Sequence, residues 1–405
     1  MATNPDLDSF LGGLIAQIES SERPFILLGR GAAGLGKPDL DFLSALGIPI
    51  GVTWSGASLA SRVRNYVGVV GQFGRPTANR AFHLSDVALV LGSRLPTTVT
   101  GHNRDMLRGK IFHVDLDSAE LGIAQVRLQT SGVAATVRQV IDGLRGVAGH
   151  PVMTEAINYI PWLGALQDEF LAEQVALRDS LLIPSSDGFA SIVSHAAIAN
   201  LFMGVRCNDH LVIDGGGTAL YSAFQAAPLD KFRNVVSLNA ISSMGTAPGQ
   251  MSGVLNSTTD GRVIGVIGDG SFAMALNALP KIALNPRAVL VVLSNQGYLA
   301  IRHTQERFLG SRFDGTWHSD DEDLPSVEKI ARALGMNYVR HSTDCNGIEE
   351  TLANLDHAPE AASVIEIETD PAQPPFWSVS TKLSLGGKLI PNPLSVMTFM
   401  GRQDD

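Results

Sequence analysis

The chain lacks the features that mark several protein classes. It has two cysteines among 405 residues, Cys207 and Cys345, too few for a disulfide scaffold, and no C-x-x-C pair suggests zinc. Its 30 basic residues are outnumbered by 40 acidic ones, so it has no basic footprint for nucleic acid. It has no run of about 18 apolar residues that would span a membrane, and its acidic first residues are unlike a secretory signal. These absences favour a cytoplasmic protein that binds neither nucleic acid nor membranes.

Glycine is abundant, and short apolar runs recur along the whole chain. The 41 glycines and 20 prolines indicate many tight turns. Apolar runs that close on glycine, aspartate or asparagine alternate with stretches long enough for helices, a pattern typical of buried parallel strands. The runs are residues 24–29, 46–54, 87–93, 110–117, 210–217, 234–239, 262–270, 288–297 and 362–370. We therefore expect an α/β protein with two consecutive doubly wound parallel sheets.

The runs fall into two groups, which gives the domain plan. Residues 1–150 are expected to form a first, Rossmann-like domain, and residues 181–405 a second one. Residues 151–180, rich in Leu, Ala, Glu and Gln, are expected to form a helical connection between them. Functional groups in such sheets gather at the carboxyl ends of the strands, so the motifs that follow the runs are the candidates for chemistry.

The strongest motif is Gly268-Asp269-Gly270-Ser271 with Asn295-Gln296-Gly297. Residues 272–283 read as a helix between two strands, so the right-handed crossover rule makes those strands parallel and places Asp269 and Asn295 at one end of the sheet. A carboxylate, an amide oxygen and a backbone carbonyl suit Mg²⁺, and the glycines allow a diphosphate to approach the backbone. The alternative is that both segments are ordinary turns.

Here the chain resembles a known family. The stretch GDGSFAMALNALPKIA…VLVVLSNQGYLAIR is similar to the diphosphate-binding motif of thiamine-diphosphate enzymes, in their acetohydroxyacid-synthase-like branch. PFILLGRGA through FHVDLDSAELG resembles the middle domain of that branch, and LPSVEKIARALGMNYVR…VIEIETDPAQPPF continues the likeness. The resemblance implies a thiamine-diphosphate-binding domain after the Rossmann-like middle domain, with thiamine diphosphate and Mg²⁺ as cofactors.

The resemblance also assigns residues to the cofactor. Asp269 and Asn295 would hold Mg²⁺ through their side chains, and Gly297 through its carbonyl. Family members often have Gln-His at the position of Gly217 and Thr218, so the side-chain contacts differ here. The cofactor-binding residues expected in total are Gly216, Gly217, Thr218, Ser242, Met244, Gly268, Asp269, Gly270, Ser271, Asn295, Gly297 and Tyr298.

Two of these residues carry a catalytic expectation. In the family, a bulky apolar residue at the position of Met244 wedges between the two rings of the cofactor and bends it. The carbonyl of Ser242 would accept a hydrogen bond from the amino group of the cofactor. Such a wedge preorganises the cofactor's own base within reach of its reactive carbon. The alternative is that Met244 is a core residue.

A third motif, Gly29-Arg30-Gly31-Ala32-Ala33-Gly34, is a G-x-G-x-x-G directly after an apolar run. It allows an interpretation as an NAD site with Asp115 or Asp117 on the ribose, although these aspartates lie far beyond the usual spacing of about 20 residues. Many members of the resembled branch hold FAD in the middle domain, and Arg94 matches one of the segments that face it. FAD and a vestigial glycine-rich turn are equally open interpretations.

Family enzymes normally carry a pyrimidine-binding domain ahead of the middle domain, and this sequence shows none. That domain supplies the glutamate that protonates the cofactor's pyrimidine. The hypothesis is therefore a split enzyme: a separate subunit supplies the catalytic glutamate, in a hetero-oligomer built on a dimer of this chain. A truncated chain and an inactive remnant are the alternatives.

The reaction that the resemblance implies is decarboxylation of a 2-oxo acid such as pyruvate, followed by ligation to a carbonyl acceptor. A decarboxylase without ligation, a nicotinamide dehydrogenase and a non-catalytic scaffold are the competing functions. Thr304 and Gln305 stand where the branch often has an acceptor-selecting tryptophan, which suggests a different acceptor. His303 and Gln305 either reach the pocket or belong to an exposed helix face.

Overall fold

The computed structural model describes most of the chain and forms two compact units. The described residues are 5–101, 109–146, 159–184, 190–238, 241–316, 324–342, 347–355, 360–371, 373, 377–379, 381–383, 389–392 and 395–399. One unit comprises residues 1–172 with 377–405, and the other comprises residues 173–376. The predicted boundaries at residues 150 and 180 stay a prediction.

The first unit is built on a six-stranded, all-parallel sheet in the order β3-β2-β1-β4-β5-β6. All five residues of β1 are buried, as its unbroken apolar sequence predicts for a central parallel strand. The strands are β1 (Pro24–Leu28), β2 (Ile50–Val52), β3 (Tyr66–Val69), β4 (Val87–Leu91), β5 (Lys110–Asp115) and β6 (Ser131–Ala134).

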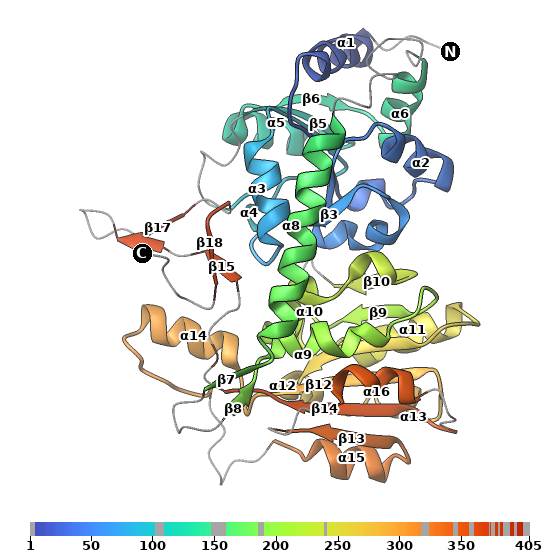
Figure 1. Cartoon of the computed structure of the whole chain (residues 1–405), viewed down its shortest axis with the longest axis vertical. Coiled ribbons are helices and arrows are strands. Elements are labelled where there is room, and N and C mark those ends of the chain that lie inside the picture. The colour runs from blue at the N-terminus through green and yellow to red at the C-terminus, as the bar shows by residue number, and fades with distance from the viewer. Residues whose placement is uncertain are drawn as a thin grey trace. The chain divides into compact units, whose positions relative to one another are not determined.

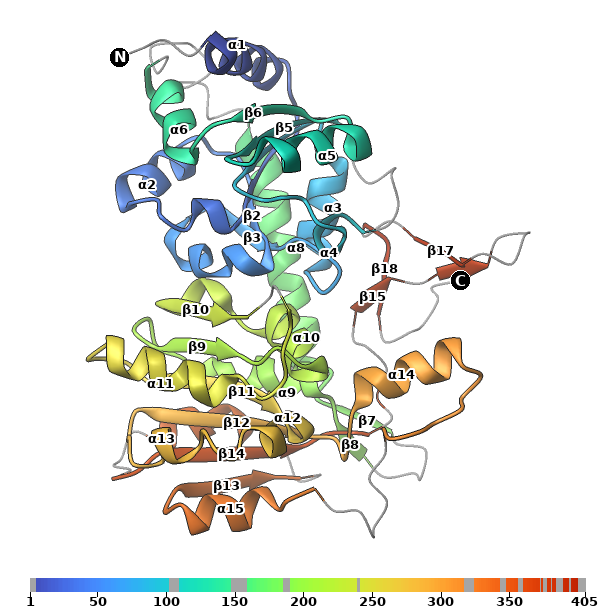
Figure 2. The same ribbon diagram turned by 180° about the vertical axis from the view of Figure 1, so that it is seen from behind.

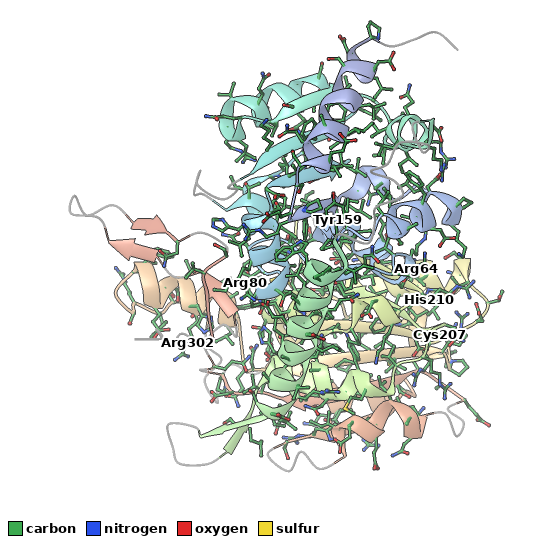
Figure 3. All side chains as sticks on the ribbon, turned by 45° about the horizontal axis from the view of Figure 1, so that its top comes forward. Arg64, Arg80, Tyr159, Cys207, His210 and Arg302 are labelled. Atoms are coloured by element: carbon green, nitrogen blue, oxygen red, sulfur yellow. The ribbon has the colours of Figure 1, made fainter. Side chains whose placement is uncertain are left out.

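Helices flank this sheet, and one face of its core gathers Phe25, Leu27, Val67 and Phe82. Tyr159, labelled in Figure 3, donates its hydroxyl to the carbonyl of Ile18 at 2.7 Å and so ties the start of the longest helix to the first one. The helices are α1 (Pro5–Glu19), α2 (Lys37–Ala45), α3 (Pro76–Leu84), α4 (Thr97–Thr100), α5 (Ser118–Leu128), α6 (Val137–Gly146) and the start of α8 (Ile160–Asp179). Short strand pairs from the C-terminal segment belong to this unit: β15 (Trp377–Val379) with β18 (Met397–Phe399), and β16 (Thr381–Leu383) with β17 (Leu389–Pro391).

The second unit repeats the design with the strand order β10-β9-β11-β12-β14-β13, again all parallel. Figure 1 shows α9, α10 and α16 over one face of this sheet, and Figure 2 shows α11 and α13 over the other. The strands are β9 (His210–Ile213), β10 (Asn234–Ser237), β11 (Val263–Gly268), β12 (Ala288–Ser294), β13 (Asn337–His341) and β14 (Ser363–Glu368), with a small antiparallel pair β7 (Leu182–Pro184) and β8 (Ala190–Ile192). The helices are α9 (Ser194–Leu201), α10 (Gly217–Ala226), α11 (Ala247–Ser257), α12 (Asp269–Met274), α13 (Pro280–Ala283), α14 (Leu299–Phe308), α15 (Val327–Ala333) and α16 (Ile348–Asn354).

The predicted fold class is confirmed, with one local correction. The helix expected over residues 272–283 is two short helices, α12 and α13, separated by turns. Pro280 has no amide hydrogen to continue a helix from the preceding turn, and it sits instead in the first turn of α13, where none is needed. The crossover from β11 to β12 still returns the chain parallel to itself, because Gly268 lies beside Leu293.

Candidate functional site

Asp269 stands at the carboxyl end of β11 and is tied to the loop after β12. Its Oδ1 accepts the amide of Gly270 at 2.7 Å, and its Oδ2 accepts the amides of Asn295 at 2.9 Å and Gly297 at 3.3 Å. Burial raises the pKa of Asp269 above its ordinary value, although these amides favour the charged form. The structure thus brings together the two segments that the crossover rule predicts to meet.

Asn295 places an unused oxygen beside this carboxylate. Its side chain is buried, and its Oδ1 has no hydrogen-bond partner in the part of the chain that the structure describes. Its Nδ2 lies 3.5 Å from Oγ1 of Thr218 at the start of α10. A buried amide oxygen without a donor is costly unless something else occupies it, and a hard cation is a natural occupant.

These groups fit Mg²⁺. Asp269 offers a carboxylate, Asn295 a free amide oxygen and Gly297 a backbone carbonyl, all hard oxygen donors. No group of three or more His, Cys, Asp and Glu side chains that could hold a metal occurs among the described residues, so such a site depends on this mixed donor set. The turn that presents Gly297 is unusual, because Gln296 adopts a left-handed φ of 60° without being glycine.

The segments surround a cavity of about 260 Å³ at the carboxyl edge of the second sheet. All twelve predicted cofactor residues line it, from the loops that follow β9, β10, β11 and β12. The lining residues that the sequence did not single out are Gly215, Tyr221, Leu299, Ala300 and Ile301. Tyr221 lies one helical turn after Thr218 on α10, and this three-residue spacing is the signal that could have found it.

The loop that carries Ser242 and Met244 packs on the glycine turn after β9. A Cβ on Gly216 would lie 2.8 Å from Cγ of Met244 and 2.8 Å from Oγ of Ser271, so glycine is needed for this close approach. Ser242 adopts a left-handed φ of 54°. Met244 is half-buried and lines the cavity, so it does not lie in the interior of the core, and its role as a wedge stays a prediction.

Gln305 and its neighbours lie outside this cavity. The Gln305 side chain clamps the segment after α14: it donates to the carbonyl of Asp314 at 2.8 Å and accepts the hydroxyl of Thr316 at 2.9 Å. Thr304 bonds back to the carbonyl of Ala300. Arg302, labelled in Figure 3, lies 4.7 Å from the ring centroid of Phe313 in the same segment. Neither His303, Thr304 nor Gln305 lines the cavity, so the idea that His303 and Gln305 reach the pocket is not supported.

The G-x-G-x-x-G of the first unit has a packing explanation. The amides of Gly29 and Gly31 donate to the carbonyls of Leu91 and Gly92, each at 2.9 Å, so they are not free for a phosphate. A Cβ on Gly31 would lie 2.7 Å from Cα of Gly92.

Asp115 and Asp117, the candidate partners of a ribose, both accept hydrogen bonds from nearby backbone amides. Asp117 caps α5 through the amide of Ala119, and Asp115 accepts the amide of Asp117. Arg94 pairs loosely with Glu120 at 3.5 Å. These contacts speak against a nicotinamide site at this loop, while FAD stays a prediction.

Comparisons with known proteins identify the two domains. Residues 11–144 match the family model "Thiamine pyrophosphate enzyme, central domain", and residues 215–367 match "Thiamine pyrophosphate enzyme, C-terminal TPP binding domain".

Among the described residues, none of the helices combines the length and apolar character needed to cross a bilayer.

Acetolactate synthases are among the similar curated proteins. Acetolactate synthase 3, chloroplastic, of Brassica napus is 24% identical over 82% of this chain and 50% of its own length. The acetolactate synthase large subunit of Pyropia yezoensis is 25% identical over 79% and 52%, and the acetolactate synthase of Mycobacterium bovis is 26% identical over 78% and 51%. The chain thus spans about half the length of these relatives. With both domain models matched in order along the chain, it belongs to the thiamine pyrophosphate enzymes, as an acetolactate-synthase-like member.

Proposed function

We propose that this chain is the large subunit of a thiamine-diphosphate-dependent enzyme that decarboxylates a 2-oxo acid, such as pyruvate, and joins the remaining acyl group to a carbonyl acceptor. The observation that carries the proposal is the cavity itself. It gathers all twelve predicted cofactor residues around a buried Asn295 oxygen without a donor.

The diphosphate end would lie between two glycine-bearing turns. The N-terminus of α10 lines the cavity with Gly217 and Thr218, and its N-cap residue, Gly216, has no side chain to cap it, so the amides of its first turn suit an anion. On the other side a Cβ on Gly268 would meet nothing within 4 Å, which leaves room at the backbone. Asp269, Asn295 and Gly297 would hold Mg²⁺ against the diphosphate.

Met244 and Ser242 would support the ring end of the cofactor. Met244 lies against Gly216 and lines the cavity, which supports a role in holding a bent ligand. When bound, thiamine diphosphate supplies the nucleophilic carbon and the electron sink that decarboxylation needs. The protein would hold the reacting groups in the right geometry, which lowers the entropic cost of bringing them together.

The start of α14 would exclude water from the acyl group. Leu299, Ala300 and Ile301 line the cavity beside Tyr298, whose ring covers Gly270. An apolar wall slows protonation of the acyl group and favours its transfer to a second carbonyl compound. This wall supports ligation over simple decarboxylation.

The lining of the cavity supports a second polypeptide at the site. Asp269 is the single carboxylate among the described lining residues, and both of its oxygens accept backbone amides. A proton-donating glutamate for the pyrimidine therefore has to come from elsewhere. We propose that a pyrimidine-binding subunit completes the site, in a hetero-oligomer built on a dimer of this chain.

Asp269→Ala tests the cofactor assignment. We expect the variant to lose measurable retention of thiamine diphosphate in the presence of Mg²⁺, because a metal ligand and the anchor of the Asn295 loop are both removed. The measurement is isothermal titration calorimetry, with Asp260→Ala, an exposed aspartate of the same unit, as the control. Retention and full activity in Asp269→Ala would contradict the proposal.

Native mass spectrometry of the tagged chain, purified from its own source cells, tests the partner. A co-purifying subunit of about one domain, ~100–200 residues, with bound thiamine diphosphate would support the split enzyme. A homo-oligomer without the cofactor would contradict it. With the complex in hand, aldehyde and CO₂ without a ligated product would favour a decarboxylase.

A further inference from the structure

Asp214 is a buried carboxylate at the end of β9 that the proposed chemistry does not use. Its side chain has no measurable exposure, and no cation pairs with it among the hydrogen bonds and ion pairs of the described residues. A buried carboxylate is costly unless hydrogen bonds replace its water shell. Asp214 meets this requirement entirely with donors from two loops that line the cavity.

The first of these loops follows β10. We call Ser242–Thr246 the wedge loop, since it carries Met244. Oδ1 of Asp214 accepts the amide of Thr246 at 2.7 Å, the hydroxyl of Thr246 at 3.3 Å and the amide of Ala247 at 3.0 Å. Thr246 and Ala247 begin α11, whose N-cap residue makes no side-chain cap of its own, so Asp214 caps this helix from another strand.

The second loop is the glycine turn, Gly215–Gly217. Oδ2 of Asp214 accepts the amide of Gly216 at 3.3 Å and the amide of Gly245 at 3.2 Å. One oxygen atom therefore joins the glycine turn to the wedge loop. The two loops are also in direct contact, because a Cβ on Gly215 would lie 2.5 Å from the carbonyl carbon of Ser242.

We propose that Asp214 is a positioning residue that holds the wedge loop against the glycine turn. It thereby fixes the position of Met244 in the cavity before a ligand binds. Among the described residues, the ladder between β9 and β10 ends at Ile213 and Ser237, so strand pairing does not hold the two loops together. Ser242 holds its left-handed backbone inside this clamp, and such backbone persists only where its surroundings hold it. The link to the cofactor rests on the proposed function, whereas the clamp itself does not.

Asp214→Asn breaks one half of the clamp and spares the other. The amide oxygen can still accept from Thr246 and Ala247, but the amide nitrogen would face the amides of Gly216 and Gly245, and two donors cannot bond each other. We expect hydrogen exchange at Gly245 to accelerate at least tenfold in the chain without cofactor. We also expect the Kd for thiamine diphosphate with Mg²⁺ to rise at least tenfold, while the Kd for inorganic pyrophosphate with Mg²⁺ changes less.

Asp209→Asn is the matched control, because Asp209 is equally buried and lies at the other end of the same strand. It pairs with Arg262 at 2.6 Å and contacts neither loop. This variant should lower the Tm and leave the exchange of Gly245 and both Kd values unchanged. If Asp214→Asn does not fold, Thr246→Val decides, since it removes the hydroxyl contacts of Thr246 with Asp214, the Ser243 carbonyl and the Gln250 side chain while both amide bonds to Oδ1 of Asp214 remain. It should shift the same exchange and affinity by about threefold.

The outcomes separate the clamp from the function. Unchanged exchange at Gly245 in folded Asp214→Asn would overturn the inference, as would equal losses of affinity for thiamine diphosphate and pyrophosphate. Faster exchange in a chain whose wild type binds no thiamine diphosphate would support the clamp and contradict the proposed function.

Discussion

The two sheets of this chain can be compared at the points where their strand order reverses. In the first, the chain moves outward from β1 to β2 and β3, then crosses to β4; in the second it moves from β9 to β10, then crosses to β11. Ligands of open α/β sheets bind at such reversal points, outside the carboxyl ends of the strands. Glycine-rich loops follow the first strand of both sheets, at Gly29–Gly31 and Gly215–Gly217.

The loops differ in what their glycines accommodate. In the first unit, glycine lets the loop after β1 lie against Gly92 after β4, and the loop amides bond to the carbonyls there. In the second unit, the glycine turn and the loop after β11 line a cavity, and a glycine at the closest approach accommodates Met244. The same residue type thus allows close backbone packing at one reversal point and lines a cavity at the other, so a glycine motif after a strand does not by itself indicate a phosphate site.

Gly31→Ala should have the largest effect on stability. The new Cβ would lie 2.7 Å from Cα of Gly92, a backbone atom that cannot yield without moving the end of β4. We expect the first unit to lose about 3 kcal/mol, the upper end of the usual cost of overpacking. Differential scanning calorimetry measures this. Gly34→Ala, in the same motif but with nothing within 4 Å of its Cβ, is the control and should be neutral. Equal effects of both changes would refute the packing explanation.

A neutral histidine is buried near the second reversal point, and it predicts that the stability of the second unit depends on pH. Burial lowers the pKa of His195, on α9 behind α10, to about 3, although a hydrogen bond with Gln225 opposes the shift. Below a pH of about 6.5, the ordinary pKa of histidine, His195 is protonated in the unfolded chain but stays neutral in the folded unit. The stability is therefore complete above pH 6.5 and falls as the pH drops toward 3, by about 2 kcal/mol between pH 7 and pH 5.

Hydrogen exchange of α9 and α10 at the two pH values measures this loss within the second unit. His195→Gln should remove most of the difference, whereas His83→Gln, on α3 of the first unit, should leave it intact. A pH dependence that survives in His195→Gln would assign it to other groups.

Much of this comparison follows from the sequence, and some of it could not. Apolar runs identify the central strands β1, β4, β9, β11 and β12, because strands buried on both faces have no polar period. The edge strand β13 has no such run, since only one of its five residues is buried, and it was missed along with the short β3 and β6.

Some features of the candidate site could also be predicted from the sequence, and others could not. The motifs at residues 268–271 and 295–297 were predictable because segments that follow parallel strands meet at one edge of the sheet. The other predicted lining residues, Gly216, Gly217, Thr218, Ser242, Met244 and Tyr298, were expected from the resemblance to the family. The clamp by Asp214 was not, since it joins residues about 30 positions apart through loop geometry. Whether Gly31 meets a phosphate or Gly92 depends on a loop about 60 residues later, which no local pattern reports.

Gly216→Ala tests the second loop with a smaller effect. Gly216 has an extended backbone that alanine can adopt, so the cost falls on its neighbours: the new Cβ would push Cγ of Met244 and Oγ of Ser271. We expect little change in Tm but a weaker affinity for thiamine diphosphate by about tenfold, or ~1.4 kcal/mol. Calorimetric titration measures it, with Gly249→Ala on α11 as the control, since its Cβ meets nothing within 4 Å. A large loss of stability with unchanged affinity would contradict this expectation and would mean that Gly216, like Gly31, serves packing alone.

The smallest expected effect is that of NAD⁺ on the first unit. The amides of Gly29 and Gly31 already donate to Leu91 and Gly92, so a pyrophosphate would have to displace two internal hydrogen bonds and separate two loops in contact. We expect millimolar NAD⁺ to leave the hydrogen exchange of residues 29–34 and the Tm of the first unit unchanged. Under the same conditions, thiamine diphosphate with Mg²⁺ should slow exchange at residues 215–218 and 268–271. Protection of residues 29–34 by NAD⁺ would mean that the packed loops open for a ligand, and the two reversal points would then differ in their resting state and not in their capacity to bind.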